Sequence, residues 1–206
     1  MEAEMEAWLE RLNEELADVI QRARESLVRI RTSQHGAGSA TILGEGGLLV
    51  TNAHVVRRPE AEVTMQDGRT RTASLLSYDE AADLAAFKVE DEGLPALVLG
   101  DSRSLRPGEL VVALGDPWGV AGAATAGIVI GAGAGWPEMP ASGRDWVVAD
   151  LHLRPGNSGG PLIDARGRLV GINTMMTGPD VGVAVPSHVI QGFLHRSGLT
   201  GPIEIV

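Results

Sequence analysis

The residues best suited to chemistry lie in one glycine-rich segment, 154–162, which reads Arg-Pro-Gly-Asn-Ser-Gly-Gly-Pro-Leu. Glycines let a backbone adopt positive φ and approach a ligand closely, and the two prolines restrict the turn. A serine hydroxyl becomes an effective nucleophile when a base takes its proton and N–H donors receive the developing oxyanion. We therefore hypothesise that Ser158 is a nucleophile. The loop Gly156, Asn157 and Ser158 would form an oxyanion hole, with the N–H groups of Gly156 and Ser158 as its donors.

Two other interpretations of this segment compete with that hypothesis. Gly, Ser, Asn and Pro are ordinary turn residues, so the segment alone is equally compatible with a plain structural turn. The pattern Gly156-x-Ser158-x-Gly160 also fits the nucleophile elbow of α/β-hydrolases, which must run from a strand into a helix. Here residues 161–175 read as a strand, a tight turn at 164–167 and a second strand, so the context argues against the elbow.

A base for Ser158 is sought among five histidines. His54 follows an apolar run at 48–53 that reads as a buried strand, and a general base needs such a rigid support. A buried structural histidine is the alternative for this residue. His188 and His195 fall in an expected C-terminal helix and are assigned to its surface, and His35 lies in a polar loop.

An orienting carboxylate should hold the second imidazole nitrogen and stabilise the imidazolium. Asp83 introduces the apolar strand 84–89, whose fixed backbone would let the carboxylate reach inward, and we favour it. Asp79, four residues earlier, competes for this role, and either aspartate could be a plain turn residue. The order His54, Asp83, Ser158 is that of the chymotrypsin triad, and each residue stands at the edge of an expected strand.

The elements that must position these residues are mostly strands. From residue 27 onward short β-prone runs alternate with Gly, Asp and Pro turns at intervals of about 8 to 12 residues, which indicates an all-β sandwich or barrel fold. The expected strands are 27–32, 39–43, 47–51, 61–65, 71–78, 84–89, 110–114, 123–130, 146–151, 160–163, 169–174 and 182–185. A polar linker at 100–108 divides them into two similar barrels, 27–100 with His54 and Asp83, and 101–206 with Ser158.

Helical periodicity is confined to the two ends of the chain. Residues 1–26 form an amphipathic N-terminal segment whose helix spans 2–25, and its apolar stripe fits either packing on its own domain or a coiled-coil seam between subunits. The stripe consists of Met5, Leu9, Leu12, Leu16, Val19 and Ala23. A short helix over 187–196 closes the chain, with Ser187 as its expected N-cap.

The amino-acid composition excludes or argues against several kinds of binding partner. The chain has 206 residues, no cysteine and a net charge of −10, so disulfides and thiolate metal sites are excluded and nucleic acid is not expected. No apolar run reaches the roughly 18 residues that span a bilayer, and no secretory signal pattern is visible at the N-terminus. We expect no metal, no cofactor, no membrane insertion and a cytoplasmic location.

Several stretches together carry a family resemblance. The chain resembles the chymotrypsin-fold serine proteases, most closely the HtrA/Deg branch, and the likeness covers roughly residues 27–195. Its most specific parts are Thr-Asn-Ala-His-Val-Val at 51–56 and Pro-Gly-Asn-Ser-Gly-Gly-Pro-Leu at 155–162. The other matching stretches, in family order, are 83–89, 99–102, 115–119, 126–129, 171–174 and 182–186.

The resemblance implies a serine endopeptidase built from two six-stranded antiparallel barrels with the active site between them. It implies His54 as general base, Asp83 as orienter and Ser158 as nucleophile. The substrate would be an unfolded or extended polypeptide. It would pair by strand addition with the segment near 181–185, whose first residues are Val181, Gly182 and Val183.

Three features depart from the family pattern. His152, Leu153 and Arg154 are expected to line or flank the primary specificity pocket, and the two cationic-capable groups argue against the family's preference for small aliphatic residues unless they point to solvent. No PDZ domain is expected within the 206 residues. The N-terminal helix does not match the family's trimerisation segment, so a trimer and a helix-mediated oligomer both stay open.

A binding or chaperone-like module that keeps the protease fold without catalytic turnover is the alternative function.

Overall fold

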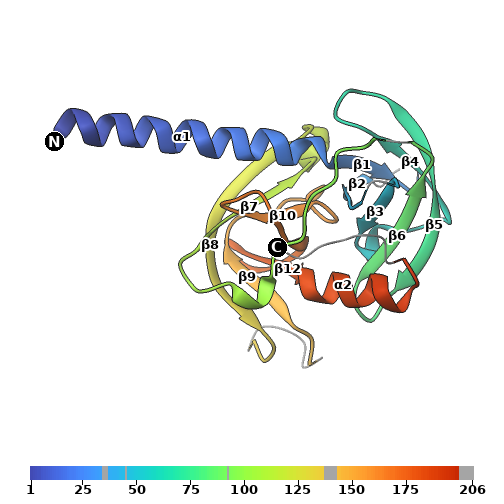
Figure 1. The fold of residues 1–206 in the computed structure, drawn as a ribbon. Helices are drawn as coiled ribbons and strands as arrows, with labels where there is room; N and C mark the ends of the chain where they lie inside the picture. The colour runs from blue at the N-terminus through green and yellow to red at the C-terminus, as the bar shows by residue number, and fades with distance from the viewer. Residues whose placement is uncertain (34–36, 45, 92, 137–142, 200–206) are drawn as a thin grey trace.

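The computed structural model describes residues 1–33, 37–44, 46–91, 93–136 and 143–199. Over these residues the strands form two closed antiparallel barrels, ordered β1-β2-β3-β6-β5-β4 and β10-β11-β12-β9-β8-β7 (Figure 1). The first barrel contains β1 Leu27–Arg31, β2 Ala37–Ile42, β3 Leu48–Thr51, β4 Glu60–Thr64, β5 Thr70–Asp79 and β6 Leu84–Val89. The second contains β7 Leu110–Gly115, β8 Ala123–Gly133, β9 Trp146–Asp150, β10 Pro161–Asp164, β11 Leu169–Gly178 and β12 Val181–Pro186. The predicted all-β class with six strands in each barrel is confirmed.

Apolar packing explains this division. One cluster of buried residues fills the first barrel and another fills the second, while a third lies between them and reaches both helices. Closing each sheet on itself removes most of the unpaired edges that short strands would otherwise expose. The predicted boundary at residue 100 falls in the segment between β6 and β7, which also carries the short 3₁₀ turn η2 Ser102–Ser104.

The N-terminal helix α1, Glu2–Glu25, has the predicted bounds. Its C-terminal half packs on the core between the barrels through Leu16, Val19, Ile20 and Ala23. Its N-terminal half runs away from the barrels (Figure 1), and four large apolar side chains there are about half exposed. They are Met5, Trp8, Leu9 and Leu12. Packing on the domain therefore accounts for only part of the apolar stripe.

The C-terminal helix α2, Ser187–Arg196, also has its predicted bounds, but the expected cap is wrong. The N-cap position is Pro186, and no side chain caps the helix. The buried Ser187 hydroxyl instead donates to the Gly100 carbonyl at 2.6 Å and accepts the Ser102 N–H at 3.1 Å. This serine thus ties the segment between the barrels to α2.

Candidate active site

The imidazole of His54 and the carboxylate of Asp83 meet at the first barrel. His54 lies in the 3₁₀ turn η1, Ala53–Val55, directly after β3, and Asp83 lies directly before β6. The two Asp83 oxygens lie 3.0 and 2.9 Å from His54 Nδ1, and Asp83 Oδ1 also accepts the His54 backbone N–H at 3.0 Å. Asp83 adopts φ +54°, a left-handed conformation that Asp tolerates better than most residues. The carboxylate therefore fixes both the ring and the backbone of His54.

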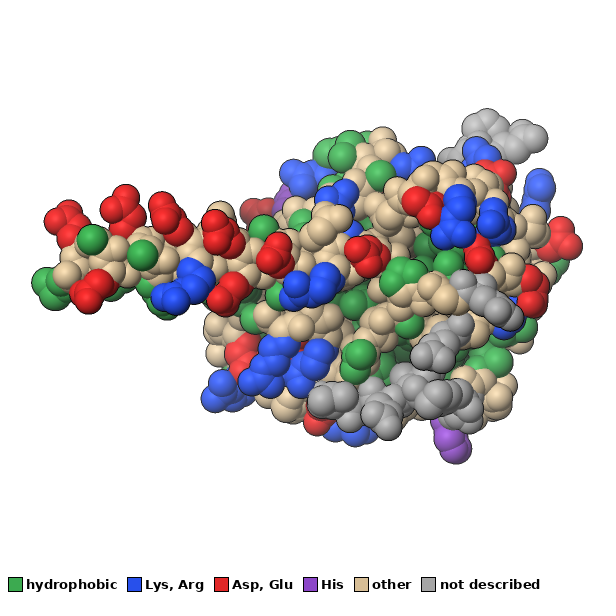
Figure 2. All heavy atoms as spheres, turned by 45° about the horizontal axis from the view of Figure 1, so that its top comes forward, with side chains coloured by type: hydrophobic (Ala, Val, Ile, Leu, Met, Phe, Trp, Pro, Cys, Tyr) green, Lys and Arg blue, Asp and Glu red, His purple; other side chains and the backbone are tan. Residues whose placement is uncertain are grey.

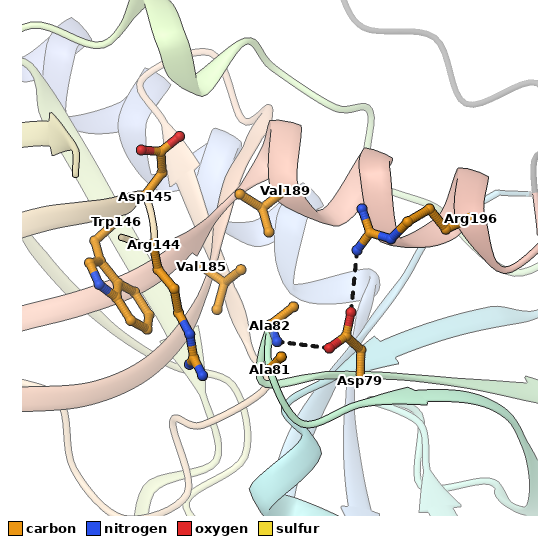
Figure 3. Close-up of a pocket in the computed structure, with 9 residues that line it drawn as sticks. All are labelled: Asp79, Ala81, Ala82, Arg144, Asp145, Trp146, Val185, Val189 and Arg196. Carbon is orange, nitrogen blue, oxygen red and sulfur yellow. Dashed lines mark hydrogen bonds and ion pairs between the residues drawn. The ribbon is translucent and has the colours of Figure 1, made fainter. Parts of the chain in front are cut away.

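Asp79, the competing candidate for the orienter, has a different task. Its carboxylate accepts the Ala82 N–H at 2.9 Å and pairs with Arg196 of α2 at 3.2 Å (Figure 3). These bonds anchor the turn that leads into Asp83. The same residues border a cavity of about 240 Å³, whose apolar wall includes Trp146 and Val189.

The Ser158 hydroxyl is linked to this pair through Thr174. Ser158 Oγ donates to the Thr174 carbonyl at 3.0 Å, and the Thr174 hydroxyl donates to Asp83 Oδ2 at 2.6 Å. Among the described residues no hydrogen bond joins Ser158 Oγ to the His54 ring, so the hydroxyl must leave the Thr174 carbonyl to reach the imidazole. The sequence interpretation missed Thr174. The signal was its place at the end of the family stretch 171–174.

The electrostatics of Asp83 follow from these contacts. Burial alone would raise the pKa of the Asp83 carboxyl, but the hydrogen bonds from His54 and Thr174 outweigh burial and hold this pKa below its ordinary value. The carboxylate is therefore ionised at neutral pH. Its two oxygens hold the His54 ring in one orientation.

The loop before Ser158 leaves two N–H groups open. Gly156 adopts φ +107°, a conformation suited to glycine. The Asn157 N–H is bonded to the Arg154 carbonyl at 2.9 Å, so of the three loop residues only Gly156 and Ser158, the two predicted donors, can offer an N–H group. Within the described residues, no acceptor is recorded for the N–H groups of Gly156 and Ser158. These two groups remain able to bind an oxyanion.

First-barrel residues hold the same loop from behind. The Ser39 N–H of β2 donates to the Ser158 carbonyl at 2.8 Å, and the Thr41 hydroxyl donates to the Gly159 carbonyl at 3.1 Å. A Cβ added to Gly159 would lie 1.9 Å from the Ser39 carbonyl oxygen. The candidate nucleophile thus belongs to the second barrel but is positioned by the first.

The three residues expected at the specificity pocket point in different directions. His152 Nδ1 lies 2.6 Å from Asp180 Oδ1 at the surface, and the exposed Arg154 guanidinium lies 5.2 Å from the centre of the Trp118 ring. Leu153 is buried with the apolar core of the second barrel. Both cationic-capable side chains are therefore engaged by partners at the protein surface.

The strand expected to pair with substrate has no free edge. Within β12, Val181, Gly182 and Val183 pair with β9 on one side and with β11 on the other, so the prediction of strand addition at 181–185 is wrong. The unpaired edge belongs to β11 instead. Its pairing with β10 stops at Ile172, which leaves 174–178 open on the side where Ser158 contacts Thr174.

A second serine–histidine–aspartate arrangement provides a contrast. His188 bonds Ser102 Oγ through Nδ1 at 2.8 Å and Asp145 Oδ2 through Nε2 at 3.0 Å. His188 is thus mostly buried rather than at the surface, contrary to the prediction. Ser102 is only 1% exposed, so no polypeptide can reach its hydroxyl, whereas Ser158 is partly exposed. We assign a structural role to this arrangement, which connects the segment between the barrels with α2 and the start of β9.

The described residues contain neither a candidate metal site nor a helix that could span a membrane. No group of three or more histidine, cysteine, aspartate or glutamate side chains is arranged to hold a metal ion there. None of the described helices combines the length and the apolar composition that crossing a bilayer requires.

Comparison with protein families shows which family the chain belongs to. Residues 38–172 match the family model described as "Trypsin-like peptidase domain", a range that includes His54, Asp83 and Ser158. The chain belongs to the trypsin-like peptidase family. Within this family its relatives are HtrA serine proteases. It is 38% identical over 196 residues to serine protease HTRA1 of Xenopus tropicalis, covering 88% of this chain and 43% of that protein.

Other relatives agree. This trypsin-like peptidase is 38% identical over 193 residues to human serine protease HTRA4, covering 87% of this chain and 40% of that protein. The solved structure of the HtrA-type protease AlgW with a tripeptide matches it with a TM-score of 0.82 and 33% identity, over 89% of this chain and 63% of the other. The chain therefore spans less than half the length of these curated relatives.

Proposed function

We propose that this trypsin-like peptidase is a serine endopeptidase. The observation that carries the proposal is the chain of contacts from the His54 ring through Asp83 and Thr174 to the partly exposed Ser158 hydroxyl. Beside that hydroxyl, the N–H groups of Gly156 and Ser158 are open. A base, its orienter, a nucleophile and oxyanion donors are the four parts that acyl transfer requires.

The reaction would proceed through an acyl-enzyme. Ser158 Oγ turns from the Thr174 carbonyl, gives its proton to His54 Nε2 and attacks the peptide carbonyl carbon. The N–H groups of Gly156 and Ser158 bind the resulting oxyanion, and Asp83 stabilises the imidazolium. The C–N bond then breaks while His54 returns the proton to the leaving amine. Water repeats these steps to release the acid and restore Ser158.

The substrate is proposed to be an extended polypeptide. The open edge of β11 at 174–178 supplies main-chain donors and acceptors next to Ser158, and an unfolded chain can pair with such an edge as an additional strand. The AlgW structure that matches this chain contains a tripeptide, which supports a peptide-binding role for the shared fold.

An uncharged apolar residue is proposed before the scissile bond. Asp180 holds His152 and Trp118 engages Arg154, while Leu153 belongs to the buried apolar cluster against which Met176 packs. A negatively charged substrate residue would therefore find both of these basic side chains already engaged. This arrangement supports the aliphatic preference that the two cationic-capable groups had put in question.

Self-association through α1 is proposed as well, with a second copy of this chain as the partner. The projecting half of the helix carries apolar side chains between acidic residues (Figure 2), and these apolar side chains are about half exposed. Packing of two copies through their projecting halves would cover these side chains.

A fluorophosphonate probe tests the enzymatic proposal against the binding or chaperone-like alternative. The probe phosphonylates an activated serine with loss of fluoride, so we expect one label per chain at Ser158, and none in Ser158→Ala. Cleavage of casein or of an unstructured peptide should vanish in the same variant, while circular dichroism remains unchanged. Absence of labelling in the unaltered protein would favour a binding role, and equal cleavage by Ser158→Ala would refute the assignment.

A further inference from the structure

The loop that follows β7 is held by an ion pair between the two barrels. Asp116 is buried, and its Oδ2 accepts Arg29 Nε of β1 at 3.0 Å while its Oδ1 accepts the Gly122 N–H at 2.7 Å. The same guanidinium donates through a second nitrogen to the Gly119 carbonyl at 2.8 Å. Arg29 of the first barrel therefore contacts the second-barrel loop at Asp116 and at Gly119. The Asp116 carboxylate in turn binds Gly122, where the loop ends.

This loop contacts the peptide units on both sides of Gly156. The Trp118 N–H donates to the Pro155 carbonyl at 3.2 Å, and the Asp116 N–H lies 3.3 Å from the Gly156 carbonyl. A Cβ added to Gly156 would lie 2.3 Å from the Asp116 carbonyl oxygen, so the two backbones are in direct contact. The Ser39 hydroxyl joins them further, donating to the Gly156 carbonyl at 2.7 Å and accepting the Asp116 N–H at 3.1 Å.

These contacts set the direction of an oxyanion donor. The Pro155 carbonyl and the Gly156 N–H belong to one peptide unit, which is planar and trans, so they point in opposite directions. When Trp118 holds that carbonyl, the Gly156 N–H must face the other way. If the peptide unit between Pro155 and Gly156 turned over, the Pro155 carbonyl oxygen would face the oxyanion in place of the Gly156 N–H. Because Trp118 lies in the loop closed by Asp116, the position of Trp118 depends on the ion pair.

We propose that Arg29 is a positioning residue for catalysis, acting through Asp116 and Trp118 to keep the Gly156 N–H directed at the oxyanion. This inference rests on the proposed endopeptidase function. Without Arg29 the carboxylate of Asp116 would be a buried charge lacking its partner, and a shift of the loop toward water would relieve this unfavourable state. The triad residues would keep their contacts, because none of them touches Arg29. The loss should thus fall on the chemical step rather than on substrate binding.

Arg31 provides a matched control on the same strand. It is an arginine two residues further along β1, and its side chain pairs with Glu62 at the surface of the first barrel. Arg31→Ala removes the same charge from the same strand without touching the loop after β7. Arg29→Lys retains the charge beside Asp116, but a lysine lacks the second nitrogen that reaches Gly119.

The experiment measures kcat and KM on an extended peptide, together with the rate of fluorophosphonate labelling. We expect Arg29→Ala to lower kcat and the labelling rate by at least tenfold, up to the roughly 10²–10³-fold loss of an oxyanion donor, with KM within twofold of the unaltered protein. Arg29→Lys should recover part of kcat, and Arg31→Ala should match the unaltered protein. Full kcat in a folded Arg29→Ala, or an equal loss in Arg31→Ala, would overturn the inference.

A second variant tests the inference if Arg29→Ala alone does not fold. Arg29→Ala with Asp116→Asn removes the unpaired charge but keeps an oxygen for the Gly122 N–H, so the barrels should remain stable while the link between them is lost. The lowered kcat should persist in this folded double variant, and its full recovery would contradict a positioning role. An unaltered protein that neither cleaves nor labels would instead refute the proposed function itself.

Discussion

Asp83 Oδ2 receives two donors at once, the Thr174 hydroxyl at 2.6 Å and His54 Nδ1 at 2.9 Å. One oxygen therefore connects a side chain of the second barrel with the imidazole of the first. Thr174 also accepts the Ser158 hydroxyl through its backbone carbonyl. A single residue of β11 thus links the carboxylate to the nucleophile, and its removal offers a direct probe of the site.

Thr174→Val should raise the pKa of the Asp83 carboxyl, because burial then acts against fewer hydrogen bonds. In the unaltered protein the folded-state pKa lies below the unfolded value of about 3.9. The ionised carboxylate therefore contributes stability above about pH 4, which is lost as pH falls through the folded-state pKa. The variant should unfold at higher pH when acid titration is followed by circular dichroism. Identical acid unfolding curves would contradict this expectation, and Thr177→Val on the same strand serves as the control.

Asp83→Asn should reduce kcat by about 10⁴-fold, because an amide cannot hold the imidazole in the required tautomer or stabilise its cation. Asp79→Asn should be far milder. It weakens an ion pair with the largely exposed Arg196, an interaction worth about 1 kcal/mol or less. Steady-state kinetics on one peptide compare the two variants. An equal loss in both would return Asp79 to consideration as the orienter.

Gly156→Ala should lower kcat by roughly 10²–10³-fold, because the new Cβ would strike the Asp116 carbonyl oxygen and displace the Gly156 N–H. Gly68→Ala is the matched control. Gly68 has φ +84°, similarly unfavourable for alanine, but no atom lies within 4 Å of the added Cβ. Both variants should lose thermal stability, of order 1 kcal/mol from backbone strain, and Gly156→Ala should lose more because its Cβ meets backbone. Only Gly156→Ala should lose activity at a temperature where both are folded.

Cleavage of a peptide library should favour small aliphatic residues before the scissile bond. Arg154→Ala should leave this preference unchanged, because its exposed guanidinium lies over the Trp118 ring. Asp180→Gly removes the carboxylate that holds His152, at a positive φ that glycine tolerates, and should improve cleavage after acidic residues. A preference for Asp or Glu in the unaltered protein would show that one of these cations does reach the substrate.

Leu9→Glu should shift the protein from a dimer to a monomer in light scattering after gel filtration. The substitution places a charge in the apolar stripe of the projecting half of α1, where Leu9 is 52% exposed. Val98→Glu is the control, because Val98 is 49% exposed on the body of the protein. A monomeric unaltered protein, or a dimer that survives Leu9→Glu, would exclude pairing through this face.

Local patterns in the sequence determined the chemistry and most of the fold. Twelve short runs punctuated by turn residues predicted the strands, and apolar periodicity predicted the bounds of both helices. The motifs around His54 and Ser158 identified the two reacting groups because turn chemistry and residue type are local properties. Their assignment to catalysis stays a prediction until the variants are made.

Contacts between distant segments were decided by the tertiary structure. These contacts are those of Asp83 with His54, of Thr174 with Asp83, and of Arg29 with Asp116, and each joins residues from distant segments of the chain. The free edge of β11 and the doubly paired β12 depend on strand order in the closed barrel. Such order and register arise from packing among residues many positions apart, so no pattern within a single strand records them.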